Sequence, residues 1–112
     1  MSPRTWEERI RDILDAIAEI QGFTRDMDFE NFRDDTRTIR AVGLNFIIIG
    51  EAANQIPEEV EKAHPGVPWH LMRAMRNRLV HAYFSIDERL VWDTVQNQLP
   101  ALIAPLEAIL AE

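Results

Sequence analysis

One stretch of apolar residues at helical spacing, from about residue 36 to residue 56, constrains the fold more than any other feature of the sequence. Its apolar side chains alternate by three and four positions, which is the period of one face of an α-helix and is typical of a coiled-coil stripe. They are Ile39, Val42, Phe46, Ile49, Ala53 and Ile56. The pattern predicts a long helix that packs on a core.

The same helix is expected to be contacted from more than one direction. It carries a second apolar side, made of Leu44, Ile47 and Ile48. Gly43 and Gly50, seven residues apart, lower the helix propensity and favour a second helix lying close against this one.

Capping signals and prolines divide the N-terminal half into further helices. Thr5 to Glu8 has capping-box spacing and predicts a first helix that runs to Gly22. Asp28 is predicted to cap a short helical turn within residues 25–35. Pro57 is predicted to end the long helix and to open a short turn over residues 58–63.

The C-terminal half is expected to be helical too. Pro68 is placed to start a helix that stops near residues 81–84. Residues 85–88, Ser-Ile-Asp-Glu, form another capping box, and the helix they open is predicted to be kinked or interrupted at Pro100. No strand-like alternation occurs. The sequence therefore predicts an all-α, antiparallel four-helix-type bundle with extra short helices, in a single domain over residues 1–112.

Composition limits the classes of function. A net charge of −7 and a pI near 4.9 argue against a protein that coats nucleic acid, because such binding depends on broad neutralisation of phosphate charge. The absence of cysteine excludes disulfides, thiolate zinc sites and cysteine nucleophiles. The three histidines lack the spacing of a metal pair, so we expect no metal and no other cofactor. With no apolar signal core and no long uncharged span, we expect a cytoplasmic protein without a membrane segment.

Basic and proton-carrying side chains concentrate in residues 73–83, Arg-Ala-Met-Arg-Asn-Arg-Leu-Val-His-Ala-Tyr. In a helix, the apolar positions form one stripe and the rest of the circumference carries nitrogen donors, namely Arg73, Arg76, Asn77, Arg78 and His81. His81 lies near the expected end of this helix, where carbonyl dipoles favour the imidazolium and keep its titration near neutral pH. A histidine with an arginine can supply the proton transfers and charge stabilisation that cleavage of RNA without a metal requires.

The spacing of these two residues poses a geometric difficulty. Five residues on a helix separate two side chains by about 140°, so Arg76 and His81 do not share one narrow face, whereas Asn77 and His81 do. Either the long arginine bends around the helix, or the site is assembled between two copies of the helix across a two-fold axis.

Residues 76–83 resemble the Arg-x4-His-x-Tyr signature of the HepT-like branch of the HEPN superfamily. Further segments stand in the order and rough spacing of that family, so that the resemblance covers nearly the whole chain. They are Ile49 to Ala53, His64-Pro65 leading to Pro68-Trp69, Met75 to Arg78, and Val91 to Val95. The resemblance implies a metal-independent endoribonuclease with Arg76 and His81 as its catalytic pair.

The resemblance also implies the partners. HepT-like proteins are homodimers whose signature residues meet in a cleft at the subunit interface, so we expect a homodimer, with the second apolar side of the 36–56 helix contributing to its interface. Such a protein is the toxin of a toxin-antitoxin pair, and its antitoxin is a minimal nucleotidyltransferase that transfers AMP to the signature tyrosine, here Tyr83. The added phosphate would compete for Arg76 and repel an RNA backbone.

Other interpretations stand beside this one. By spacing alone, Arg76 and His81 fit a surface ion pair and a helix-capping histidine better than a catalytic pair. Arg73 and Arg78 are expected to be solvated or paired with acids, although either can touch phosphate. For Asn77, orienting His81 or the phosphate is weighed equally against a simple place on the helix surface.

Glu51 and the remaining histidines are expected to be structural. Glu51 is a charge in an otherwise apolar helix, so an ion pair with an arginine of residues 73–83 is favoured over a catalytic role. His64 and His70 are expected to have structural roles, and the tryptophans to act in the core or an interface. The chief alternative for the whole chain is a non-catalytic HEPN partner of a nucleotidyltransferase that binds a nucleotide or substrate, and a structural dimerisation domain comes third.

Overall fold

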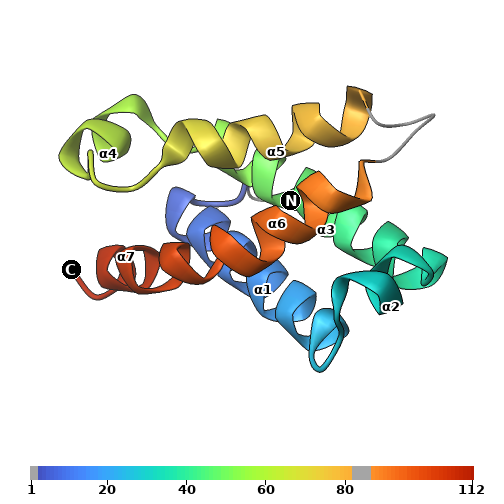
Figure 1. Cartoon of the computed structure of the whole chain (residues 1–112). Helices are drawn as coiled ribbons and strands as arrows, with labels where there is room; N and C mark the ends of the chain where they lie inside the picture. Colours follow the sequence, from blue (N-terminus) through green and yellow to red (C-terminus); the bar gives the residue numbers. More distant parts are fainter. Residues whose placement is uncertain (1–2, 82–86) are drawn as a thin grey trace.

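The computed structural model describes residues 3–81 and 87–112, with the side chains of residues 78–81 left out. Within these residues the secondary structure consists of seven α-helices and no strand (Figure 1). The helices are α1 (Trp6–Thr24), α2 (Phe29–Arg33), α3 (Thr36–Asn54), α4 (Glu58–Ala63), α5 (Trp69–His81), α6 (Glu88–Asn97) and α7 (Pro100–Leu110). The all-α bundle with extra short helices is thus confirmed, because α2 and α4 are the short helices and α6 with α7 forms the last, interrupted one.

Two of the predicted helix caps are present. The Thr5 hydroxyl accepts a hydrogen bond from the Glu8 amide at 3.1 Å, and the Asp28 carboxylate accepts one from the Asn31 amide at 2.8 Å. Helix α1 extends two residues past the predicted end at Gly22. The extra residues are helical because Thr24 is buried and its hydroxyl donates to the Ile20 carbonyl at 2.9 Å.

The predicted cap of α6 is wrong by two residues. The capping box predicted Ser85 as the N-cap, but Asp87 occupies this position and its carboxylate accepts the Leu90 amide at 3.0 Å. Aspartate is as good an N-cap as serine, and its carboxylate also meets the positive end of the helix dipole. Ser85 itself lies outside the described residues.

Helix α3 forms the centre of the bundle, with α1 on one side and α5 on the other (Figure 1). The residues of its predicted apolar stripe are all buried. Helices α6 and α7 close the core from the remaining side, where the Trp92 ring lies against Phe32 of α2 with ring centroids 5.2 Å apart. The tryptophans predicted for the core are therefore correctly assigned at Trp69 and Trp92, and Trp6 is partly buried against the same core.

Pro100 separates α6 from α7, as predicted, and stands at the start of α7, where its missing amide hydrogen costs no helical hydrogen bond. Gln98 and Leu99 between the two helices keep right-handed helical backbone angles. Helix α7 therefore follows α6 after a junction of two residues (Figure 1). None of the described helices combines the length and the apolarity needed to cross a membrane.

Candidate functional site

Arg76 and Glu51 form an ion pair where α5 crosses α3. The Arg76 Nη1 atom lies 2.9 Å from the Glu51 Oε1 atom, and each side chain is 47% exposed. The ion pair expected for Glu51 with an arginine of residues 73–83 is present, although Glu51 is half exposed and not buried. A guanidinium has five N–H donors, so a single contact leaves Arg76 with donors for a second anionic group such as a phosphate.

Gly50 sets how closely Arg76 approaches α3. A Cβ atom at this position would lie 2.7 Å from the Arg76 Cβ atom and 3.2 Å from its backbone nitrogen, so glycine is required for the helices to meet at this distance. This close contact is what Gly50 was expected to indicate. Because Gly50 precedes Glu51 directly, one turn of α3 fixes both the backbone and the charged end of Arg76.

Arg73 differs from Arg76 in its surroundings. Arg73 forms an ion pair with Glu61 of α4, in agreement with the expected pairing with an acid, and is only partly exposed. Asn77 is exposed beside Arg76. The backbone of Arg78 lies in α5, but its side chain is outside the described part of the chain.

The second member of the predicted pair, His81, also belongs to α5. Its backbone is described, so the separation of Arg76 and His81 by five residues of continuous helix, about 140° of rotation, holds. The His81 side chain and all of Tyr83 lie outside the described residues. The structure therefore gives the environment of Arg76 and leaves the roles of His81 and Tyr83 as predictions.

An exposed apolar row leads along α3 to this ion pair. Leu44, Ile47 and Ile48 are 60%, 37% and 38% exposed, although they lie on the central helix of the bundle. Glu51 follows Ile47 by four residues and Leu44 by seven, which places the carboxylate on the same face of α3. The second apolar side predicted for this helix is thus left uncovered by the described residues, beside Glu51, the partner of Arg76.

The remaining histidines are outside this site. His64 lies between α4 and α5, with Nδ1 2.9 Å from the Val60 carbonyl oxygen and Nε2 2.7 Å from Glu112 Oε2. The hydrogen bond to Glu112, followed by that to Val60, raises the pKa of His64. The predicted structural role of His64 agrees with these contacts. His70 is exposed in the first turn of α5.

Sequence reasoning did not find Glu61 as the partner of Arg73. The two residues lie on different helices with a turn between them, so no local periodicity links them. The described residues contain no group of three or more His, Asp or Glu side chains placed to hold a metal ion.

The comparison with known proteins agrees with the resemblance carried by residues 76–83. The family model "Ribonuclease HepT-like" matches residues 13–109. A Thermococcus cleftensis protein named "Probable ribonuclease HepT" is 41% identical over 106 residues, which cover 95% of this chain and 96% of that protein. A Methanocaldococcus jannaschii protein named as a candidate RNase is 39% identical over 101 residues, 90% of this chain and 84% of its own. A third relative, also named as a candidate RNase, comes from Caldanaerobacter subterraneus and is 33% identical over 110 residues, 97% of this chain and 95% of its own.

No solved structure matches this chain. The family model covers far more than half of the sequence, and the relatives match over nearly their full lengths. The chain belongs to the ribonuclease HepT-like family.

Proposed function

We propose that this protein is a metal-independent endoribonuclease and the toxin of a HEPN and minimal nucleotidyltransferase toxin-antitoxin pair. The observation that carries the proposal is the placement of Arg76, which is half exposed, held by Glu51 at 2.9 Å and five residues before His81 on the same helix. The close helix contact at Gly50 also fixes the Arg76 backbone in this place.

The chemistry divides between the two residues. His81 takes the proton of the RNA 2′-hydroxyl. The 2′-oxygen attacks the adjacent phosphorus while the bond from phosphorus to the 5′-oxygen breaks. A protonated imidazole then gives a proton to the departing 5′-oxygen. The Arg76 guanidinium donates hydrogen bonds to the phosphoryl oxygens as charge builds on them. The products are a 2′,3′-cyclic phosphate and a 5′-hydroxyl, and no metal is required.

The site is completed by a second copy of the chain. Positions 76 and 81 are separated by about 140° of rotation on one helix, so a phosphate reaches Arg76 and His81 most directly when α5 of a second protomer faces the first. The exposed row Leu44, Ile47 and Ile48 supports this arrangement, because a dimer that covers it brings the two Arg76 side chains toward the same interface. A two-fold contact through one patch closes the assembly at two copies.

Control by the antitoxin acts through Tyr83, two residues after His81. Transfer of AMP to its hydroxyl adds a phosphate beside the catalytic pair. This phosphate competes with RNA for Arg76 and repels the RNA backbone. The partner is a minimal nucleotidyltransferase that binds this chain and transfers AMP from ATP to the Tyr83 oxygen, with release of pyrophosphate and of the hydroxyl proton.

Catalysis is tested with purified protein on RNA in the presence of EDTA, together with growth after induction in a bacterial host. Wild type is expected to cleave RNA and stop growth, and His81→Ala to do neither. His70→Ala is the matched control, because His70 is an exposed histidine of the same helix, and it is expected to behave as wild type. Equal growth and equal cleavage for wild type and His81→Ala would refute the proposal, and nucleotide binding without cleavage would favour the non-catalytic alternative.

The dimer and the modification are tested separately. Leu44→Lys is expected to yield monomers without RNase activity, whereas Phe23→Lys, which changes another exposed apolar residue at 42% exposure, is expected to leave the dimer intact. A monodisperse wild-type monomer at micromolar concentration would contradict the composite site. Co-expression with the nucleotidyltransferase is expected to add the mass of one AMP to wild type and none to Tyr83→Phe.

A further inference from the structure

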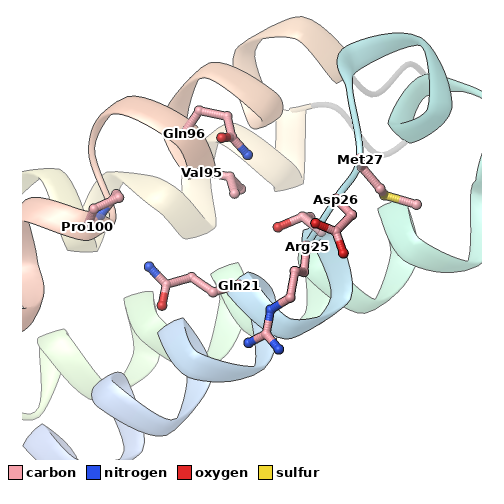
Figure 2. A pocket seen from close by; sticks show the side chains of 8 residues that line it. Gln21, Arg25, Asp26, Met27, Val95, Gln96 and Pro100 are labelled. Atoms are coloured by element: carbon pink, nitrogen blue, oxygen red, sulfur yellow. The ribbon is translucent and has the colours of Figure 1, made fainter.

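A groove lies between α1 on one side and α6 and α7 on the other. It consists of two pockets of about 380 Å³ each, which share Gln21. Figure 2 shows the first of them, with Gln21 and Arg25 of the α1 end on one side and Val95, Gln96 and Pro100 on the other. The second pocket continues the groove between Leu14 and Ile103. The groove contains none of the residues of the Arg76 site.

Both walls of this groove present a stripe with the spacing of a helix-packing surface. Four of the lining residues on each wall follow one another by four, three and four positions, which is the spacing of residues along one face of a helix. They are Leu14, Ala18, Gln21 and Arg25 on one wall, and Gln96, Pro100, Ile103 and Glu107 on the other. The second set spans the junction of two helices, with Gln96 on α6 and the other three residues on α7.

The dimensions suit a helix of another chain. From Leu14 to Arg25 the wall rises by about 16 Å, or three helical turns. The apolar side chains of the second pocket are Leu14 and Ala18 on the α1 wall and Ile103 on the α7 wall. Leu14 and Ile103 are half buried, and Ala18 is exposed. A third helix laid between these walls would complete a three-helix contact, as amphipathic helices do in grooves of other proteins.

The charge of the groove specifies its occupant. Asp15 and Glu107 lie on opposite walls of the apolar pocket, and neither has an ion pair or hydrogen bond to another side chain among the described residues. The C-terminal wall brings no compensating charge, because residues 90–112 contain no lysine or arginine. An occupant with lysine or arginine on both sides of its apolar stripe would neutralise both carboxylates.

We propose that this groove is a docking site for an amphipathic helix of a partner protein that carries basic residues flanking an apolar stripe. A second copy of this chain fits poorly. Each copy carries a net charge of −7. If the exposed apolar row on α3 of one copy entered the groove of another copy, the contact would be head-to-tail, and such a contact does not close into a dimer.

The probe is a fluorescein-labelled, lactam-bridged helical peptide of about four turns, with leucines at four-three-four spacing and lysines flanking them. Its affinity for the full chain is measured by fluorescence anisotropy. Ala18→Arg, which changes an exposed position on the α1 wall of the groove, is expected to weaken binding at least about tenfold by filling the groove with a basic side chain. Ala101→Arg is the matched control, because Ala101 is an exposed alanine of α7 outside the groove lining, and it is expected to bind as wild type.

Charge is tested by reversing both partners. A peptide with glutamates in place of the lysines is expected to bind wild type about fivefold or more weakly, and to regain affinity for the double variant Asp15→Lys, Glu107→Lys. Equal binding of both peptides, or no effect of Ala18→Arg, would overturn the proposal. If Ala18→Arg lowers the oligomeric state of the protein without peptide, the groove is a self-association surface and the proposal is wrong.

Discussion

Replacing Gly50 with alanine tests the contact that positions Arg76. The added Cβ would lie 2.7 Å from the Arg76 Cβ atom, about 0.7 Å inside the 3.4 Å at which ordinary contact begins. Both atoms belong to packed helices, so neither side chain can rotate away, and α5 must shift relative to α3. Overpacking of this kind costs about 1–3 kcal/mol, whereas glycine to alanine within a helix gains about 1 kcal/mol.

Gly22→Ala separates these two effects. Gly22 lies inside α1, and a Cβ there would meet no atom within 4 Å, so this variant has only the gain in helix propensity. The difference between the two variants therefore gives the cost of the contact, about 1–3 kcal/mol. For a chain of this size, each kcal/mol of lost stability lowers Tm by roughly 4 °C.

The assay is thermal or urea unfolding of wild type, Gly50→Ala and Gly22→Ala at one protein concentration, because the Tm of a dimer depends on concentration. We expect Gly22→Ala to be more stable than wild type and Gly50→Ala to be less stable. RNA cleavage should fall in Gly50→Ala and stay constant in Gly22→Ala, since only the first displaces Arg76. If both variants gain the same stability, the close packing of α3 on α5 at Arg76 is refuted.

Three further perturbations follow from the same contacts. Glu51→Gln should change the free energy of unfolding by less than about 1 kcal/mol, because the ion pair with Arg76 is half exposed. The same variant should lower the RNase rate, because Arg76 is no longer held in place. An unchanged rate would exclude a positioning role for Glu51. Asp28→Ala should lower the unfolding free energy by about 1 kcal/mol in urea denaturation through loss of the cap on Asn31, and no loss would contradict the cap. Glu112→Gln should lower Tm at acidic pH, where His64 is protonated, and its effect should fade as pH rises through the raised folded pKa of His64.

The sign of the pH effect follows from the tautomer of His64. The Val60 carbonyl can only accept, so Nδ1 of His64 carries a proton and donates to it. In the neutral ring, Nε2 would then turn a lone pair toward the Glu112 carboxylate, and protonation replaces this repulsion with a hydrogen bond. The folded pKa is raised above the ordinary value, so the contribution to stability is complete at acidic pH and is lost as pH rises through the folded pKa. A His64 titration by NMR with an ordinary or lowered pKa would contradict the contact.

Part of the candidate site was accessible from the sequence and part was not. The spacing of residues 73–83 located the arginines and His81 on one helix, because helical periodicity is a local property. Glu51 was expected to pair with one of these arginines, yet its partner is Arg76 and not Arg73 because of the position at which α5 crosses α3 at Gly50. Arg73 is directed instead to Glu61 of α4, which no spacing indicated.

The sequence by itself determined which segments are helical and which residues form the buried stripes, because hydrogen bonds, caps and apolar periods act within a few residues of one another. It also determined the family, since the signature and its flanking segments are linear patterns. Only the tertiary structure decided which residues meet across helices, namely Arg76 with Glu51 and His64 with Glu112, and which apolar faces stay uncovered on α3 and along the groove beside α1. These contacts depend on how whole helices cross, and a crossing position is set by the sum of many side-chain contacts over the core.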